Sequence, residues 1–461
     1  MSKVTGVMSF TFYKPLPFWL TGMLLFTGVF AVLPEAQAAE NLLSLYQKAL
    51  QYDAQYKAAT ANTEAEREEI NKVRSLFLPR LQFGANVGHG ATDRTTQTIA
   101  GSVESKLNYD IESYSLQLRQ SLFNKENLAS YRSAEANIKS KEALLLKENA
   151  TLITRLAAAY FETLYAQEKI SVIRSNIDAV TQQRDQAQRR YEHGEGTVTE
   201  INEAQAALEL AEAELISTQN SLEVFKQSLS NITGVPVDSI AALNTDNLPG
   251  LAAESDSVEY WLDQAINNNP EIAAARLSFE AARQDVEKKR AGHYPTVDLV
   301  GVRSYSENDS NNTLGSSFDT TTIALQLNMP LFAGGFTSAN VRQAIHRVDA
   351  AEEILNLRTR DIEANTKKFV NSIRSGLLSI QAYRQAVTAS EIALEGTQKG
   401  FSAGTRTNIE VLNAQQKLYA SRLELSRVQY ILVNDIINLK QAAGMLNEAQ
   451  LHSLNQFFAI N

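Results

Sequence analysis

The sequence predicts an α+β protein in which a few amphipathic β-strands accompany very long, paired α-helices. Three observations lead to this class: stretches of alternating apolar and polar residues, helical stretches without Pro or Gly, and a duplication that repeats both features. The chain has 461 residues, of which only 21 are Gly and 9 are Pro. So few turn-forming residues favour long helices over a loop-rich sandwich.

Composition removes several classes of protein and site. The net charge is −9 at pH 7, and no nucleic-acid partner is expected because phosphate affinity comes from an excess of Lys and Arg. The chain has no Cys, which excludes disulfides, Cys-ligated zinc, thiol nucleophiles and a lipidated N-terminal cysteine. The five His are isolated and lack metal-ligand spacing, so no metal, cofactor or enzymatic activity is expected.

The N-terminus has the pattern of a secretory signal peptide. Lys3 and Lys14 precede an apolar run over residues 18–33, and Ala36-Gln37-Ala38 supplies a small-residue cleavage site. The alternative is a transmembrane anchor, but the apolar run over residues 18–33 is shorter than the roughly 20 apolar residues that a spanning helix needs. The sequence therefore predicts a signal peptide over residues 1–38 and an exported mature chain. Because no later segment is apolar enough for a membrane helix, any membrane span must be built from strands.

The rest of the chain is two copies of one unit. Residues of the first copy recur at constant offsets: Arg67, Arg74 and Pro79 recur 216 residues later, and Gly194, Thr197 and Gly234 recur 210 residues later. An offset that holds across many positions indicates duplication. The segment between the copies contains Pro and Gly and is typical of a linker. The predicted organisation is a first repeat over 39–234, a linker over 235–256, a second repeat over 257–444 and a C-terminal tail over 445–461.

Each repeat contains two stretches with the two-residue period of a β-strand. The stretches are residues 81–88, 114–119 and 322–329, with a less regular strand after Pro295. Long polar loops are expected at the hairpin ends, over 89–108 and 306–319. An ordinary half-buried sheet in a soluble domain alternates in the same way, so the pattern alone leaves both alternatives open.

If these strands span a membrane, one chain cannot close the barrel. Four strands are too few, because single-chain barrels begin at about eight. An open edge in lipid would leave backbone groups without hydrogen-bond partners. Several protomers must then share one barrel.

The helical stretches are the stronger pattern. Over residues 124–191 and again over 337–375 there is neither Pro nor Gly, and apolar residues recur at steps of three and four. About 68 residues at 1.5 Å each predict a helix of roughly 100 Å. A turn near Gly194 and a return helix to about Ile232 follow. Such lengths indicate a coiled-coil column.

The motif after the second helical turn is Gly404-Thr405-Arg406-Thr407, followed by Glu410-Val411-Leu412-Asn413-Ala414. With the duplication, the Leu-Pro-Arg start of the first strand and the Gln-Ser-Leu-Phe end of the second, it resembles the TolC family of outer-membrane efflux and secretion ducts. The resemblance covers essentially the whole mature chain. It implies a homotrimer in which four strands per protomer form a shared twelve-strand transmembrane β-barrel, continuous with a long periplasmic α-helical coiled-coil barrel.

The resemblance also implies an activity and its partners. A channel-tunnel in the outer membrane of a Gram-negative bacterium would export drugs and other small molecules, or proteins by type I secretion. It would work with a periplasmic adaptor (a membrane fusion protein) and an inner-membrane RND, ABC or MFS transporter. Its barrel would contact outer-membrane lipid.

Matched residue by residue, the family's closed periplasmic end falls on two groups of positions. The gate and constriction residues are Glu410, Asn413, Arg406, Phe401, Thr199 and Glu200, and the turns that would contact the adaptor contain Gly194, Gly404 and Thr407. Two positions depart from the family. Phe401 replaces a tyrosine and lacks its hydroxyl, and Asn413 replaces an acid and leaves one of two charged rings neutral.

The residues themselves allow other interpretations of these positions. Glu200 and Glu410 lie in the first turns of their helices, where a carboxylate stabilises the N-terminal dipole without any gating role. In a trimer the same residues would form rings of negative charge that favour cations. Arg406 is either an exposed turn residue or a clamp that bonds a neighbouring helix.

Two other classes of protein compete with a duct. A periplasmic coiled-coil adaptor or scaffold without a membrane-spanning barrel would explain the helices but not the four amphipathic strands. A surface adhesin or phage receptor would use the exposed loops without transport.

Overall fold

The structure, a computed structural model, describes residues 40–243, 257–310 and 313–455. The predicted signal peptide and the later part of the predicted linker, 244–256, lie outside these residues. Residues Ala39–Asn461 form one unit. Of the helices described, none has both the length and the apolar character needed to cross a membrane.

The duplication is visible in the order and lengths of the helices. Each copy starts with helices of 11 and 21 residues: α1 (Leu42–Tyr52) and α2 (Ala54–Arg74), then α6 (Val258–Asn268) and α7 (Pro270–Arg290). Asp53 and its counterpart Asn269 start the second helix of each pair in the same way, since each side chain accepts a backbone N–H at 2.8 Å. Such N-caps satisfy donors that the first helical turn leaves free.

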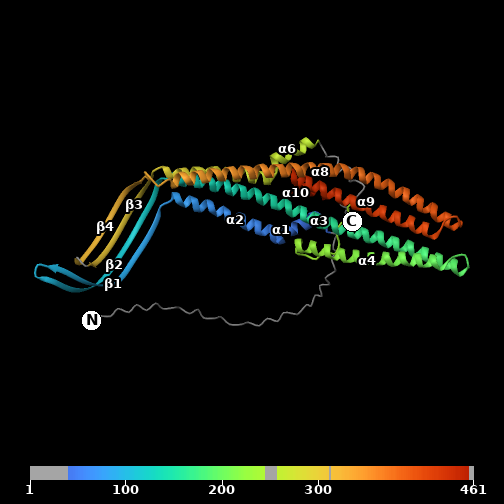
Figure 1. The fold of residues 1–461 in the computed structure, drawn as a ribbon, viewed down its shortest axis with the longest axis horizontal. Helices are drawn as coiled ribbons and strands as arrows, with labels where there is room; N and C mark the ends of the chain where they lie inside the picture. Colours follow the sequence, from blue (N-terminus) through green and yellow to red (C-terminus); the bar gives the residue numbers. More distant parts are fainter. Residues whose placement is uncertain (1–39, 244–256, 311–312, 456–461) are drawn as a thin grey trace, which may run out of the picture. The chain divides into compact units, whose positions relative to one another are not determined.

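Two helix hairpins carry most of the chain. Their helices are α3 (Lys125–Glu192), α4 (Val198–Thr233), α8 (Phe336–Ser402) and α9 (Asn408–Ala442). The predicted long helix is confirmed, because α3 has 68 residues and at 1.5 Å per residue is roughly 100 Å long. α3 packs along α2, α4, α7 and α9, and α8 packs along α7 and α9 (Figure 1). These contacts form the coiled-coil column that the periodicity predicts.

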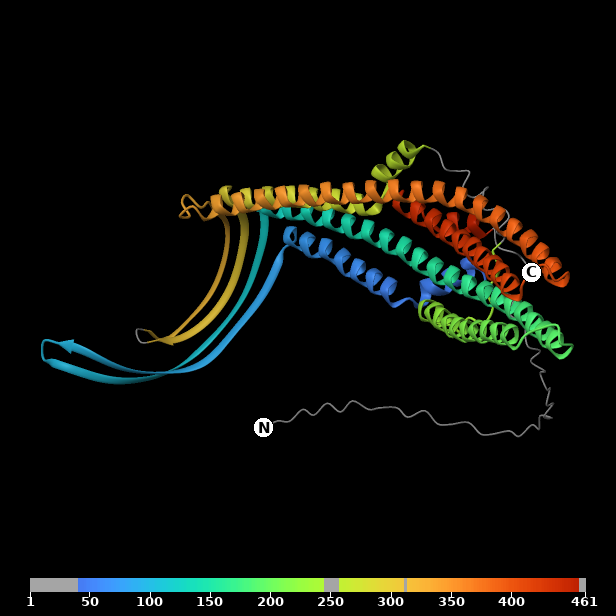
Figure 2. The same ribbon diagram turned by 45° about the vertical axis from the view of Figure 1, so that its right-hand side comes forward.

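The four strands form one antiparallel sheet in the order β1-β2-β3-β4. The strands are β1 (Arg80–Thr98), β2 (Gly101–Phe123), β3 (Thr296–Ser310) and β4 (Thr313–Asn328). β1 and β4 are the edge strands of the sheet within the protomer, and Figure 2 shows all four strands leaving the same end of the helices. Two open edges on one chain are what a barrel shared between protomers requires.

The prediction of long polar loops at the hairpin ends is wrong. Residues 89–98 and 101–108 continue β1 and β2 in ladder register, so the first hairpin turns through two residues. Likewise, β3 continues to Ser310 and β4 starts at Thr313. Both faces of the extended part of the first hairpin are polar, so the alternation that identifies a half-buried strand is missing there. Frequent Thr nevertheless suits an extended strand.

The register gives the sheet one mainly apolar and one mainly polar face, although Val300 and Val302 of the less regular strand β3 lie on the mainly polar one. Leu81 lies opposite Leu118 on the first face, and Gln82 lies opposite Gln117 on the second. Large side chains of the apolar face are 66% to 78% exposed in the protomer: Leu81, Phe83, Ile323 and Leu325. A sheet of this kind suits strands that face lipid on one side and water on the other.

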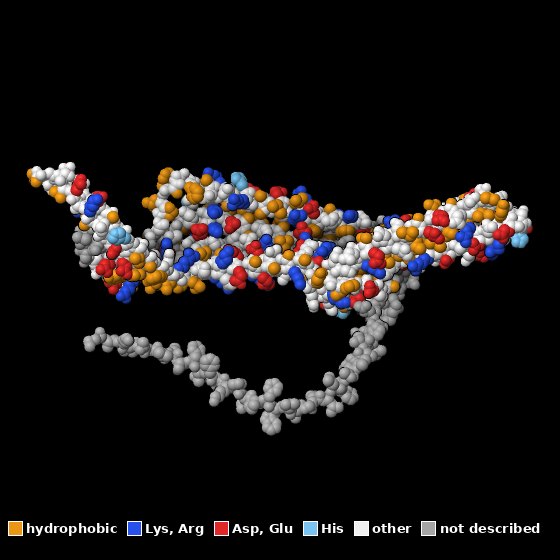
Figure 3. Space-filling model, turned by 90° about the horizontal axis from the view of Figure 1, so that it is seen from below, with side chains coloured by type: hydrophobic (Ala, Val, Ile, Leu, Met, Phe, Trp, Pro, Cys, Tyr) orange, Lys and Arg blue, Asp and Glu red, His pale blue; other side chains and the backbone are white. Residues whose placement is uncertain are grey.

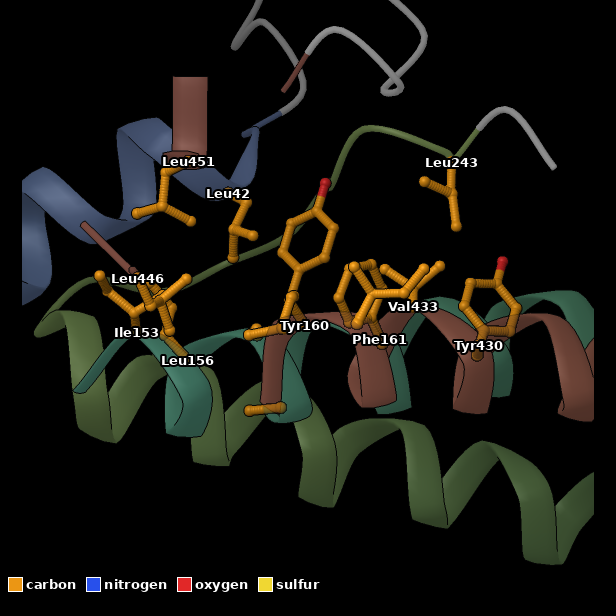
Figure 4. Close-up of a cluster of buried hydrophobic side chains, with 14 of the residues drawn as sticks. Leu42, Ile153, Leu156, Tyr160, Phe161, Leu243, Tyr430, Val433, Leu446 and Leu451 are labelled. Carbon is orange, nitrogen blue, oxygen red and sulfur yellow. The ribbon is translucent and has the colours of Figure 1, made fainter. Parts of the chain in front are cut away.

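The main hydrophobic core lies where α1, α3, α9 and α10 (Glu448–Asn455) meet (Figure 4). Tyr160 and Phe161 are almost fully buried there, with ring centroids 5.7 Å apart. The Tyr160 hydroxyl donates to the carbonyl of Ala241 at 2.6 Å. Leu243 from the predicted linker and Leu451 from the predicted tail are buried in the same core. The described parts of the linker and tail therefore pack against the helices.

Charged side chains of both signs are interspersed along the helices, whereas hydrophobic side chains gather where the strands meet the helices (Figure 3). Leu331, Phe332 and Phe336, which follow β4, are 70% to 90% exposed. Exposed aromatic residues at the foot of an apolar band are typical of a membrane interface.

Candidate functional site

Both helix hairpins turn at the same kind of glycine. Gly194 lies between α3 and α4 with φ of 76°, and Gly404 lies between α8 and α9 with φ of 73°. A side chain is strained in this left-handed region, so Gly is the residue that allows the tight turn. The turns predicted at these glycines are present, at the ends of the hairpins remote from the sheet (Figure 1).

A buried amide joins the two hairpins beside these turns. Asn408, the first residue of α9, is 1% exposed, and Gln183 of α3 is 4% exposed. Gln183 Nε2 donates to Asn408 Oδ1 at 2.5 Å, and Asn408 Nδ2 donates to the carbonyl of Glu200 in α4 at 3.1 Å. One side chain of α9 therefore binds both helices of the other hairpin.

Gln183 and Asn408 were not among the residues predicted from the sequence. Asn408 follows the Gly404 turn among other polar residues, and Gln183 is one of many amide residues on α3. The buried face of α3 is rich in Ala and Ser, so another polar residue on that face, such as Gln183, does not stand out in the sequence.

A second contact between the hairpins involves Phe401. Its ring is 3% exposed, and the guanidinium carbon of Arg190 on α3 lies 4.6 Å from the ring centroid. This is cation–π geometry. The Phe401 ring is held by packing and by a positive charge from the other hairpin.

The first turn of α9 is closed by its own side chains. Glu410 Oε2 accepts from the backbone N–H of Thr407 at 2.7 Å and from its hydroxyl at 3.0 Å. Arg406 Nη1 donates to Glu410 Oε1 at 2.6 Å. Thr407 and Glu410 form a capping box, which pairs donors that a helix start otherwise leaves free. Within the protomer Arg406 therefore bonds its own turn rather than a neighbouring helix.

These bonds make Glu410 a strongly acidic group. The backbone N–H of Thr407, the guanidinium of Arg406 and the hydroxyl of Thr407 lower the pKa of Glu410 to about 2. All three favour the ionised carboxylate. The helix-capping interpretation of Glu410 thus has direct structural support.

The remaining predicted residues are spread around this turn. The backbone N–H of Glu200 donates to Thr197 Oγ1 at 3.2 Å, which caps α4. Asn413 is exposed and lines a groove of about 430 Å³ together with Glu203 and Leu210 of α4. Thr199 is also exposed. Within the described residues, no group of three acidic or His side chains could hold a metal ion.

The chain matches the family described as "Outer membrane efflux protein" over residues 45–235 and 261–445. It belongs to this family. It is 31% identical to the "Proteases secretion protein PrtF" of Dickeya chrysanthemi, over 94% of each chain. It is 30% identical to the "Outer membrane protein TolC" of Escherichia coli (strain K12), over 90% of this chain and 85% of that one. The crystal structure of the outer membrane protein VceC from Vibrio cholerae superposes with a TM-score of 0.72 at 21% identity, covering 87% of this chain and 96% of that chain.

Family membership identifies the membrane in which the sheet lies and the assembly to which the hairpins belong. The chain is an outer-membrane channel of the efflux and secretion class in a Gram-negative bacterium. Its fold is the predicted one, a twelve-strand barrel shared by three protomers and continuous with a helical tunnel. Members of this family are passive channels and work within larger efflux systems.

Proposed function

We propose that the turns at Gly194 and Gly404 form the closed periplasmic gate of an export duct. The observation that supports this is the bridge from Gln183 to Asn408, with the Arg190–Phe401 contact beside it. Both contacts join the α3/α4 hairpin to the α8/α9 hairpin. Opening the tunnel at this end requires the hairpins to separate, and these contacts oppose that separation.

The predicted gate residues divide into two roles in this proposal. Arg406, Thr407 and Glu410 keep the α9 turn rigid, while Phe401 and the Glu200 carbonyl receive contacts from the other hairpin. Asn413 and Thr199 are exposed and would line the constriction or meet a partner. A pivot for α9 is available at its other end, where Asn269 Nδ2 donates to the carbonyl of Ala442 at 2.8 Å.

The duct itself performs no chemistry in this proposal and has neither a cofactor nor a metal. Energy comes from an inner-membrane transporter, which is linked to the duct by a periplasmic adaptor that contacts the Gly194, Gly404 and Thr407 turns. The mature chain begins after residue 38. A scaffold role without a membrane-spanning barrel is the weaker candidate, because it leaves the exposed apolar face of the sheet unused.

Two cargo classes fit the relatives' names. PrtF is named for protease secretion, which favours protein export with an ABC transporter. The family is named for efflux, which favours small molecules with an RND or MFS transporter. We place protein secretion first, because a named protein-secretion relative matches over 94% of this chain.

The test combines channel recording with the mass of the purified mature protein in detergent. A trimer that gives small, discrete currents in planar bilayers is the expected result. A soluble monomer or dimer without currents would contradict the duct and favour the scaffold. Complementation of a channel-deficient strain then separates the cargoes, by the amount of protease secreted and by drug susceptibility.

A further inference from the structure

Two arginines face each other where the strands join the helices. The register places Arg80, the first residue of β1, directly opposite Arg119 of β2. Directly opposed residues of an antiparallel pair lie on the same face of the sheet, about 5 Å apart at their Cβ atoms. This is the polar face, since Gln82 and Gln117 are the next pair on it. Like charges in this arrangement repel, so an anion placed between them is stabilised.

Among the described residues, only one of these two guanidinium groups has an acidic partner. Arg119 Nη2 lies 2.6 Å from Asp298 Oδ2 on β3. The Asp298 side chain is 10% exposed, whereas the Arg119 side chain is 54% exposed. Among the described residues Arg80 has no ion pair, so each protomer keeps one uncompensated positive charge here.

The arginines line a cavity of about 310 Å³. Asp298 is the acidic residue of its wall, and hydroxyl and amide groups of Ser121, Thr296 and Asn124 supply further donors. The wall is anchored to the helices, because Asn127 Nδ2 donates to the carbonyl of Leu76 at 3.1 Å.

We infer that Arg80 and Arg119 form a binding site for an oxyanion: a carboxylate, sulfate or phosphate group. A guanidinium presents two parallel N–H donors that match the oxygens of such a group. In the barrel the polar face lines the water-filled pore. The site therefore recurs three times at the level where the tunnel enters the barrel, and it would take a free anion or an acidic group on passing cargo.

This site needs the sheet and its junction with the helices to be intact, but it does not need the proposed gate at the Gly194 and Gly404 turns. The probe is inorganic phosphate, and its binding to the detergent-solubilised trimer is measured by equilibrium dialysis at constant ionic strength. We expect saturable binding near one phosphate per protomer. Arg80→Gln should weaken it at least tenfold, and Arg80→Lys should restore part of it because the charge returns.

Arg303→Gln is the matched control. Arg303 lies in the same sheet but on the opposite face, opposite Leu116, and pairs with Asp319 at 3.1 Å. This variant should bind phosphate like the wild type. Absence of saturable binding to the wild type, or equal loss in Arg80→Gln and Arg303→Gln, would overturn the site. Channel currents recorded from the same preparations show separately whether the duct itself is intact.

Discussion

Gln183 Nε2 lies 2.5 Å from Asn408 Oδ1, although the two residues are 225 positions apart in the chain. Both side chains are almost completely buried. A buried amide–amide bond adds little net stability to a coiled coil, because each partner must be desolvated before the bond forms. Its value lies in specificity: when the hairpins separate, both amides lose their partner at once.

Replacing Asn408 by Leu should weaken the contact between the two hairpins beside the Gly194 and Gly404 turns. The change leaves Gln183 buried without a partner, which costs about 1–3 kcal/mol, and that cost falls on the closed arrangement. We therefore expect a higher single-channel conductance. Gln183→Leu should act in the same way. The double variant should fall short of the sum of the two single effects, because the second change no longer breaks a bond. Additive effects in this cycle would contradict the coupling.

Removal of the Arg406 guanidinium should raise the single-channel conductance less than loss of the bond between Gln183 and Asn408 does. Arg406→Ala deletes the bond to Glu410 and leaves the capping box intact. Since the ion pair is exposed to solvent, we expect conductance to rise by only about twofold. Arg422→Ala is the control, because Arg422 pairs with Glu391 at 2.8 Å between α9 and α8. If both variants behave alike, Arg406 has no special role at the gate.

The pKa of Glu410 predicts how the Gly404 turn and the start of α9 respond to acid. Its folded-state pKa of about 2 is below the ordinary value of 4.5. The ionised cap therefore stabilises the turn above the ordinary pKa, and this stabilisation is lost as the pH falls from about 4.5 towards 2. Conductance should be constant between pH 7 and pH 5 and should rise below about pH 3. Glu410→Gln should abolish that acid response, and a transition near pH 6 would point to a different group.

The long helices were predictable from sequence because their cause is local. The absence of Pro and Gly across α3 and a periodic apolar stripe are both properties of neighbouring residues. The strand ends were not predictable in this way. Over residues 89–108 the ladder continues through segments that have no apolar face, so only the partner strand fixes their conformation.

The candidate site likewise has one part that local sequence predicts and one part that depends on contacts between distant segments. The capping box of Thr407 and Glu410 follows from a three-residue spacing after a Gly turn, so Glu410 was predictable from the sequence as a helix-start carboxylate. The bridge from Gln183 to Asn408 depends on how α3 packs against α9. No local pattern carries that information.

Gly404 offers a test of the turn that is independent of charge. Its φ of 73° strains any other residue, while no heavy atom beyond the adjacent residues of the chain lies within 4 Å of where a Cβ would be built. Gly404→Ala should therefore cost about 1–2 kcal/mol through the backbone alone. Local opening should expose the turn, so that trypsin cleaves after Arg406 about fivefold faster or more. Gly396→Ala, within α8 and equally unobstructed, should not accelerate cleavage.

The two faces of the sheet can be distinguished with a pair of neighbouring residues in β4. Ile323 lies on the apolar face opposite Gly301, and Thr322 lies on the polar face opposite Val302. Both are exposed in the protomer. In the barrel Ile323 faces hydrocarbon, where a lysine costs about 2–4 kcal/mol near the bilayer midplane. Ile323→Lys should therefore reduce the amount of heat-stable trimer extracted from outer membranes.

Thr322→Lys adds the same charge one residue away. Its side chain should enter the water-filled pore, so trimer yield should stay near the wild-type level and only ion selectivity should change. Equal trimer loss in the two variants would mean that the sheet does not separate lipid from water. A normal yield for Ile323→Lys together with a loss for Thr322→Lys would reverse the assignment of the faces, and with it the pore location of Arg80 and Arg119.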